Sequence, residues 1–228
     1  MRKLFSALVL LLSFIFVGQV SAQSFSETPQ WVKDLPAAKN AKQLFVVAGM
    51  GGTTAWISMH EKDANGNWRQ IITTPGFVGK GGIGKTKEGD NKTPVGTFVI
   101  DKAFGIAPDP GCAMPYTQVD ENIYWSGDAN YKYNQWVDIR ENPNLNKDDS
   151  EHIVYYNPHY MYVLNIGYNK ECTPGKGSAL FIHCFGPAKP WTGGCVSLPE
   201  EKMKTVMQNI KPGCVAVIDS AENLGAKY

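Results

Sequence analysis

The residues most suited to chemistry in this sequence are a histidine, His183, and a cysteine, Cys195, which follows across a short loop. A cysteine at its ordinary pKa of about 8.5 is mostly protonated near neutral pH, so it needs a neighbouring base before it can attack a carbonyl carbon. His183 can be that base if the loop folds back, and Pro187 and Pro190 restrict the conformations of the loop. The pair predicts acyl transfer through a thioester, with Cys195 as nucleophile and His183 as general base and acid.

The turn before Cys195 is suited to stabilise an oxyanion. Gly193 and Gly194 admit backbone angles that other residues resist, so their N–H groups can turn towards the carbonyl oxygen of a bound acyl group. Thr192 offers a hydroxyl beside the same turn. The alternative is structural: the Gly-Gly pair is an ordinary turn and Cys195 is a disulfide partner.

The chain contains five cysteines, which are Cys112, Cys172, Cys184, Cys195 and Cys214. An odd number in an exported protein leaves at least one thiol unpaired, and Cys195 is the candidate for the free one if two disulfides form. Cys184 and Cys214 lie in apolar runs and are equally compatible with buried free thiols. A metal site made by His183, Cys184, Cys195 and another cysteine is disfavoured, because the adjacent His183 and Cys184 would point to opposite faces of a strand.

The elements that must position this pair are mainly strands. Asn65-Gly66 lies between two strand-like runs and is a strong signal for a hairpin. A short apolar run ends in His183 and Cys184 and is typical of a buried strand. The expected strands are residues 43–48, 53–60, 68–74, 93–101, 160–168, 179–184 and 214–218.

One clear helix is predicted directly after Cys195. Ser197 is expected to cap it, Pro199 fits its first turn, and Glu200 follows Ser197 at the spacing of a capping box. The positive end of this helix would favour a thiolate at Cys195 by about 0.3–1 kcal/mol. The apolar face of the helix would consist of Met203, Val206, Met207 and Ile210. Residues 23–42 have no clear period and are expected to hold one or two helical turns at most.

The N-terminus has the composition of a secretory signal peptide, with basic residues, a short apolar stretch and small residues before position 23. An uncleaved membrane anchor is the alternative. Removal of residues 1–22 leaves 20 basic against 21 acidic residues, which gives no electrostatic footprint for nucleic acid or anionic lipid. We therefore expect an extracytoplasmic protein, in the periplasm or at the cell wall, with no nucleic-acid partner and no stable membrane insertion after signal cleavage.

Several blocks around this pair resemble the L,D-transpeptidase (YkuD-type) catalytic domain of bacterial cell-wall enzymes. The family signature is a histidine, a spacer and Ser/Thr-His-Gly-Cys, which His183, Thr192, Gly194 and Cys195 match. The glycine-rich stretch at 82–98, which ends in Thr-Pro-x-Gly-x-Phe, is also similar. Further similar blocks are residues 103–105, 133–136, 166–169 and 177–179.

The resemblance implies a mainly β fold with few helices, a β-sandwich that carries the cysteine under a loop. It implies peptidoglycan stem peptides as partners: a tetrapeptide donor is cut after its third residue, and the acyl group passes to an amine of a neighbouring stem to form a 3→3 crosslink. Because sulfur would hold the acyl group, no metal or organic cofactor is expected. An L,D-carboxypeptidase that passes the same thioester to water, and an inactive wall-binding scaffold, are the alternatives.

The resemblance also sets the expected domain organisation. We expect a signal peptide at 1–22, an N-terminal lead-in at 23–42, a catalytic domain at 43–220 and a C-terminal tail at 221–228. Gly193 stands where the family usually has a second histidine, the spacer after His183 is shorter than usual, and Ser197 replaces a common Asn or Arg. These departures concern substrate preference more than catalysis.

Other candidate residues are assigned to structure. His60, His152 and His159 have no nucleophile near them in sequence and are expected to be surface or packing residues. The glycine-rich segment at 76–84 is not followed by the pattern of a nucleotide-binding loop, because Pro94 and a β pattern come next.

Overall fold

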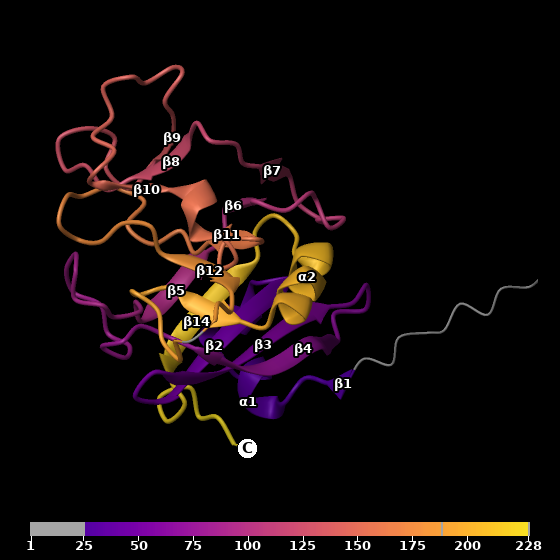
Figure 1. The fold of residues 1–228 in the computed structure, drawn as a ribbon. Helices are drawn as coiled ribbons and strands as arrows, with labels where there is room; N and C mark the ends of the chain where they lie inside the picture. Colours follow the sequence, from indigo (N-terminus) through magenta and orange to yellow (C-terminus); the bar gives the residue numbers. More distant parts are fainter. Residues whose placement is uncertain (1–25, 188, 228) are drawn as a thin grey trace, which may run out of the picture.

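The computed structural model describes residues 26–187 and 189–227 of the chain. Strands dominate these residues, and only short helices accompany them (Figure 1), which confirms the mainly β prediction. The first half of the described chain contains β1 Ser26–Glu27, α1 Gln30–Lys33, the 3-10 helix η1 Pro36–Lys39, β2 Gln43–Gly51, β3 Thr54–Lys62, β4 Trp68–Phe77, β5 Gly96–Val99, β6 Lys102–Gly105 and β7 Tyr116–Gln118. The second half contains β8 Ile123–Ser126, β9 Trp136–Asp138, β10 Ser150–His152, the 3-10 helix η2 Ile153–Tyr156, β11 Val163–Asn165, β12 Phe181–Cys184, β13 Val196–Leu198, α2 Glu200–Asn209 and β14 Val215–Ser220. The predicted signal peptide lies outside the described residues.

Most of the strands belong to one long, curled sheet. Its order is β5-β14-β2-β3-β4-β13-β12-β11-β6-β7, with β1 paired to β4, and a smaller sheet has the order β10-β8-β9. The smaller sheet lies at one end of the molecule (Figure 1). Strands β12 and β13 pair in parallel, and their register sets His183 beside Ser197. The strand that carries the histidine therefore lies directly beside the strand that follows the cysteine.

The predicted hairpin is confirmed. Strands β3 and β4 pair antiparallel over their whole length, and the turn between them contains Asn65 and Gly66 with φ +85° at the glycine. The strand expected at 160–168 is shorter than predicted, because β11 ends at Asn165. Gly167 explains the end of β11: its φ is +76°, and an added Cβ would lie 2.2 Å from the Val99 carbonyl oxygen. Extended backbone cannot continue through that position.

The predicted cap of the helix is wrong. Ser197 lies in β13, where it pairs with His183 and Phe77, and α2 begins at Glu200 with Pro199 as N-cap and no side-chain capping bond. Pairing with two neighbouring strands outweighs the local capping preference. The strand also separates Cys195 from the helix, and a helix dipole acts only within about one turn of its end. The expected support of a thiolate by this helix is therefore not provided.

The apolar face of α2 is confirmed, since Met203, Val206 and Met207 are fully buried in the main core cluster. A second cluster joins the small sheet to β12 and includes Trp125, Phe181 and Cys195. Burial of these aromatic side chains fixes the two sheets relative to each other, at roughly 25 cal/mol for each Å² of apolar surface removed from water. The cysteine is thus part of the packing between the two sheets.

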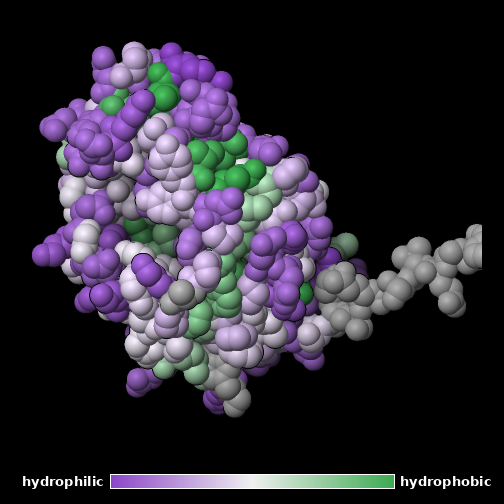
Figure 2. All heavy atoms as spheres, in the orientation of Figure 1, coloured by the Kyte–Doolittle hydropathy of each residue, from purple (hydrophilic) through white to green (hydrophobic). Residues whose placement is uncertain are grey.

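The N-terminal lead-in packs on the sheet. The one or two helical turns expected there are α1 and η1, and Val32, Leu35 and Ala38 pack against Leu44 and Val217 of β2 and β14. Among the described residues, no helix is both long and apolar enough to cross a membrane. The face of the molecule in Figure 2 carries mostly hydrophilic residues at its edges, with apolar residues gathered nearer its centre.

Candidate active site

Cys195 follows a turn that is held by hydrogen bonds of two threonine hydroxyls, those of Thr192 and Thr93. The Thr192 hydroxyl donates to the Cys195 carbonyl oxygen at 2.6 Å and accepts the Gly194 N–H at 3.1 Å. The Thr93 hydroxyl donates to the same Cys195 oxygen at 3.1 Å and accepts the Gly79 N–H at 2.9 Å. Gly194 has φ +143°, a conformation that L side chains rarely adopt, so glycine is needed there. The backbone around the nucleophile candidate is therefore fixed from both sides.

The sulfur of Cys195 is buried and contacts backbone groups. Its S–H donates to the Ala179 carbonyl oxygen at 3.3 Å, and it accepts the Phe181 N–H at 3.3 Å. Burial raises the pKa of this thiol to about 12, the charge of Glu151 adds to that increase, and the nearby charge of Lys85 opposes it. The thiol is accordingly protonated at neutral pH in the free protein.

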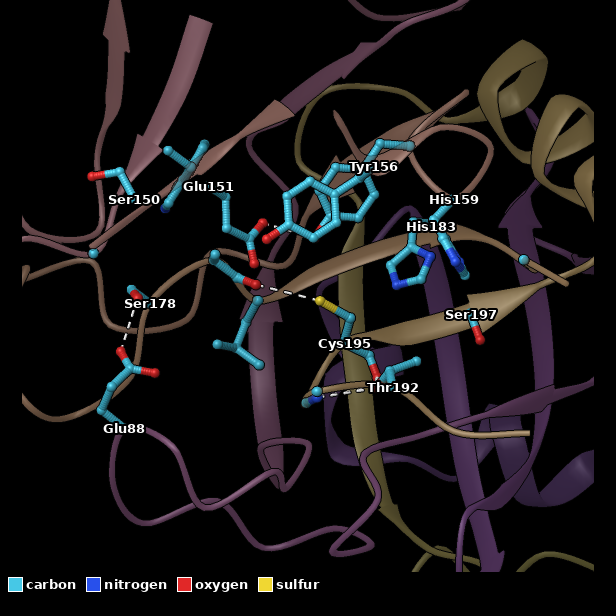
Figure 3. A pocket seen from close by; sticks show the side chains of 18 of the residues that line it. Glu88, Ser150, Glu151, Tyr156, His159, Ser178, His183, Thr192, Cys195 and Ser197 are labelled. Atoms are coloured by element: carbon cyan, nitrogen blue, oxygen red, sulfur yellow. Dashed lines mark hydrogen bonds between the residues drawn. The ribbon is translucent and has the colours of Figure 1, made fainter. Parts of the chain in front are cut away.

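His183 enters the same cavity from β12. Its Nδ1 lies 2.8 Å from the Cys184 carbonyl oxygen, which can only accept a hydrogen bond, so Nδ1 carries the proton of the neutral ring. The lone pair of the ring is then on Nε2. Burial lowers the pKa of His183 to about 4. Figure 3 shows the imidazole beside Cys195 in the pocket. The ring is therefore neutral at pH 7, with its basic nitrogen available.

The structure brings the two predicted residues together in one cavity of about 590 Å³. Among the described residues, no hydrogen bond joins His183 to Cys195, because the S–H points to Ala179. Cys184 lies on the opposite face of β12, buried in the main core, where its S–H points to the Tyr162 carbonyl oxygen. The expectation that His183 and Cys184 point to opposite sides is confirmed. All five cysteines are free thiols in the structure.

The glycine-rich block at 82–98 supports this site through a buried ion pair. Lys85 Nζ lies 2.9 Å from Asp90 Oδ1, and both side chains are less than a tenth exposed. Burial opposes the ionised form of Asp90, but backbone N–H groups, Thr86 first, and Lys85 hold its pKa well below the usual value. The segment at 76–84 adds a further support, because Gly79 forms a bridge with Thr192. Both segments therefore help to hold the turn that precedes Cys195 in place.

The block at 133–136 positions the other side of the sulfur. Asn134 has φ +56°, and its side-chain oxygen accepts the Ala179 N–H at 3.1 Å and the Trp125 indole N–H at 2.9 Å. Ala179 itself has φ +52°. Asn134 thus stabilises the unusual backbone conformation that directs the Ala179 carbonyl towards Cys195.

The cavity residues that the sequence did not assign to the site include Tyr160, Glu151 and His159. The Tyr160 hydroxyl donates to Glu151 Oε2 at 2.8 Å. Burial raises the pKa of Glu151 to about 7, although the bond from Tyr160 opposes the increase. His159 was expected to be a surface or packing residue, but it lines the cavity with its ring centroid 5.9 Å from that of His183. No sequence signal separated these residues from ordinary loop and strand positions.

One family model matches most of the chain. The family model described as "L,D-transpeptidase catalytic domain" (YkuD) matches residues 52–218. The chain belongs to the L,D-transpeptidase catalytic domain family. No curated protein matches it. Its fold is thus that of a family linked to peptidoglycan.

Two solved structures are similar to this L,D-transpeptidase domain. One is the helical cell shape determining protein Pgp2 from Campylobacter jejuni, with 16% identity and a TM-score of 0.42 over 78% of this chain and 47% of that one. The other is an L,D-transpeptidase (Yku) from Stackebrandtia nassauensis, with 16% identity and a TM-score of 0.35 over 84% of this chain and 63% of that one. The chain spans about half the length of the first.

The backbone at Gly193, where this L,D-transpeptidase domain departs from the family signature, has room for a side chain. An added Cβ at Gly193 would have no atom within 4 Å, and its φ is not in the left-handed region, in contrast to Gly194. The backbone therefore has room for the histidine that the family signature places there. The loss of that imidazole leaves the turn itself intact.

The remaining histidines have packing roles, as predicted. His60 is fully buried, with its Nδ1 3.0 Å from the Thr28 hydroxyl and its Nε2 2.8 Å from the Ser58 hydroxyl. His152 stacks on Tyr124 and its Nε2 lies 2.8 Å from the Glu121 carbonyl oxygen. Neither ring lines the cavity of Cys195.

Proposed function

We propose that the protein is an exported L,D-transpeptidase that forms 3→3 peptidoglycan crosslinks through a thioester on Cys195. The observation that carries the proposal is the contact of His183 Nδ1 with the Cys184 carbonyl oxygen. That contact fixes the tautomer, so the unprotonated Nε2 is left in the cavity that Cys195 lines. A fixed, neutral imidazole beside a thiol is the arrangement that nucleophilic catalysis by cysteine needs.

The proposed reaction has two halves. In the first, the Cys195 proton moves to His183 Nε2 while the sulfur attacks the carbonyl carbon of the third residue of the donor stem. The tetrahedral intermediate then collapses, the protonated His183 gives its proton to the leaving D-alanine amine, and a thioester remains. In the second half, His183 takes a proton from the acceptor amine as this attacks the thioester, and the thiol is restored.

The oxyanion would be stabilised by fewer groups than the sequence suggested. The Gly194 N–H is already bonded to Thr192, and the Thr192 hydroxyl donates to the Cys195 carbonyl oxygen. Within residues 26–187 and 189–227, no hydrogen bond is assigned to the N–H of Gly193 or of Cys195. We therefore propose these two N–H groups as the oxyanion donors, with Gly194 and Thr192 as supports of the turn.

Deprotonation of the thiol would accompany attack in this proposal. The pKa of Cys195 is raised to about 12 and that of His183 is lowered to about 4, both by burial. A thiolate–imidazolium pair is therefore not the resting state. The proton moves when the substrate carbonyl is in place to receive the sulfur, which protects the thiol from unwanted reactions in between.

The test is a product analysis with tetrapeptide muropeptides. The purified protein is expected to release D-alanine and to yield crosslinked dimers, whereas tripeptide alone would mean an L,D-carboxypeptidase. Cys195→Ala and His183→Ala should abolish both products. Cys184→Ser is the matched control, because a serine retains a donor for the Tyr162 carbonyl oxygen on the other face of β12.

Acylation by a carbapenem separates an enzyme from an inactive wall-binding scaffold. A mass increase on Cys195 that is missing in Cys195→Ala is expected for a reactive thiol. Absence of both acylation and turnover in the wild-type protein would contradict the proposal and favour the scaffold.

The export of the protein is part of this proposal. Its substrate class lies outside the cytoplasm, and residues 1–22 have the composition of a cleaved signal peptide. Expression in a bacterial host should yield a mature form that begins at Gln23, which the mass of the intact protein from the periplasm or medium checks.

A further inference from the structure

Tyr160 connects the three ionisable groups on one side of the cavity. Its hydroxyl donates to Glu151 Oε2 at 2.8 Å. Tyr160 packs in the same buried cluster as Cys195, its hydroxyl lowers the pKa of that thiol, and its ring centroid lies 5.2 Å from that of His183. Figure 3 shows the Glu151 carboxyl and the Cys195 sulfur on the same side of the pocket.

A phenol has only one proton to donate. An ionised Glu151 is an acceptor only, and it takes the proton of Tyr160 in the hydrogen bond that the structure shows. A protonated Glu151 can instead donate to the phenol oxygen. The proton of Tyr160 is then free to turn towards the sulfur of Cys195. The two possible partners of this hydroxyl therefore compete.

We propose that Tyr160 is a positioning residue for Cys195, and that the protonation of Glu151 decides which partner its hydroxyl serves. With Glu151 protonated, Tyr160 donates to the sulfur and stabilises the thiolate. With Glu151 ionised, this donor is withdrawn. In both states the proton of Cys195 passes to His183 Nε2, so only one S–H bond breaks and one N–H bond forms. The inference deepens the thiol acyl transfer proposed above and rests on it for its relevance to turnover.

The surroundings of Glu151 support such a switch near neutral pH. Burial raises the pKa of Glu151 to about 7, the bond from Tyr160 opposes the increase, and the charge of Glu88 adds to it. An ionised Glu151 also raises the pKa of Cys195 through its charge, so both effects have the same sign. Besides Glu151, Tyr160 and Cys195, the titratable groups that line the cavity are Lys85, Glu88, Asp148, Asp149, Tyr156, His159, His183 and Lys189.

The neighbouring charges are themselves held in place. Lys85 is fixed by its buried ion pair with Asp90. Glu88 accepts hydrogen bonds from the hydroxyl groups of Tyr133 and Ser178. Because these partners are independent of Tyr160, replacing Glu151 changes one charge in an otherwise fixed set.

The experiment measures the rate at which iodoacetamide alkylates Cys195 between pH 5.5 and 8.5, resolved by peptide mass spectrometry from the other cysteines. Glu151→Gln should match the wild-type protein at pH 5.5, where Glu151 is protonated. At pH 8.5 it should react about three- to tenfold faster, since a shift of one pKa unit changes the thiolate fraction about tenfold. Tyr160→Phe should react more slowly than the wild-type protein at pH 5.5.

The double variant distinguishes a hydrogen-bond switch from the effect of charge alone. In the Tyr160→Phe background, the gain from Glu151→Gln at pH 8.5 should be smaller than in the wild-type background, because only the charge of Glu151 is then left to act on Cys195. A gain that persists in full means that Glu151 acts only through its charge, and it overturns the proposal. A ratio of Glu151→Gln to wild-type rates that does not change with pH overturns it as well.

The matched control is Tyr156→Phe, which removes the hydroxyl of the ring stacked on Tyr160 at 4.6 Å. Its alkylation profile should follow the wild-type protein, and a change as large as that in Tyr160→Phe contradicts the assignment. If Tyr160→Phe does not fold, Tyr160→Met takes its place in the double variant, because it also removes the hydroxyl and an unbranched side chain adapts to irregular space in a core. Alkylation needs no muropeptide, so the two proposals can fail separately. A wild-type protein that shows this switch without turnover contradicts the proposed function and supports the role of Tyr160 and Glu151.

Discussion

His60 and His183 are both buried in strands of the large sheet, and burial lowers the pKa of each to about 4. They differ in the partners of their ring nitrogens. Both ring nitrogens of His60 form hydrogen bonds with hydroxyl groups, those of Thr28 and Ser58. A hydroxyl can donate or accept, so these partners are compatible with either tautomer of the ring. One nitrogen of His183 lies on a carbonyl oxygen, and the other is left in a cavity.

Burial and a lowered pKa therefore do not by themselves identify a catalytic base. The pKa of His60 is lowered to about 4, as is that of His183, but His60 does not line the cavity that contains Cys195. What distinguishes His183 is a partner that fixes the tautomer and a second nitrogen with access to a thiol.

The largest expected effect comes from the same substitution at each histidine. His183→Gln should lower kcat/KM for a tetrapeptide donor by about 10²–10⁴-fold, because general base catalysis typically contributes that much. His60→Gln should leave kcat/KM nearly unchanged and lower the free energy of unfolding by about 1–3 kcal/mol, since the buried Thr28 and Ser58 hydroxyls lose a partner. Steady-state kinetics and denaturant unfolding measure the two. Equal kinetic losses in both variants would contradict the distinction.

The pH dependence of stability should be a property that both histidines share. Each has a lower pKa in the folded state than in the unfolded one, so the unfolded state binds more protons between about pH 6.5 and 4. Stability is lost as the pH falls through this window, by up to about 3 kcal/mol for each histidine. Thermal unfolding of His60→Gln should therefore vary less between pH 7 and 4.5 than that of the wild-type protein. An identical slope in the two proteins would rule out a contribution from His60.

Kinetics should separate the two histidines in the same pH range. The acid limb of kcat/KM reports the pKa of the base in the free enzyme. It should lie near the lowered value of His183, about 4, and well below the ordinary 6.5 of a histidine. His60→Gln should leave this limb in place. A limb near 6.5 would mean that the cavity is hydrated enough to remove the effect of burial.

The partners of His60 offer a smaller test. Thr28→Val removes the hydroxyl that meets Nδ1 and retains most of the side-chain volume. It should lower the free energy of unfolding by about 1 kcal/mol, the net value of a typical hydrogen bond, with no change in kcat/KM. Ser26→Ala is the control in the same strand region, because its hydroxyl forms an exposed contact with Gln70. A kinetic effect of Thr28→Val would mean that the two histidine regions are coupled.

Much of the site could be predicted because its chemistry is local in the sequence. The run that ends in His183, the Gly-Gly turn and the glycine-rich block at 82–98 each form one contiguous segment. Their residue types are required by what the backbone does, as at Gly194, where φ is +143°. The hairpin around Asn65-Gly66 was predictable for the same reason.

The remainder of the site depends on contacts that no local pattern encodes. Tyr160 and Glu151 meet Cys195 because the small sheet packs on β12 through the cluster around Trp125 and Phe181. Ser197 fits the pattern of a helix cap in the sequence. In the structure it pairs with His183 and Phe77 on the two neighbouring strands, so it is a strand residue. The sequence suggested that the Thr192 hydroxyl helps to stabilise an oxyanion. In the structure this hydroxyl donates to the Cys195 carbonyl oxygen and accepts the Gly194 N–H, so it stabilises the turn instead. Neither bond could be predicted from the sequence.

The smallest effect is expected where the chain departs from its family. Gly193→His introduces a second imidazole in the turn that precedes Cys195, at a position where an added Cβ has no atom within 4 Å. The free energy of unfolding should change by less than about 0.5 kcal/mol, as for other substitutions that touch nothing. If position 193 contributes only its backbone N–H, Gly193→His should change kcat/KM by much less than about 10²-fold. A side chain that transfers a proton would raise kcat/KM by about that factor. A larger gain would show that a second histidine can act as a base, and that the single basic nitrogen of His183 limits turnover. Combining Gly193→His with His183→Gln then decides, because only a second base can restore turnover to a protein that lacks the first.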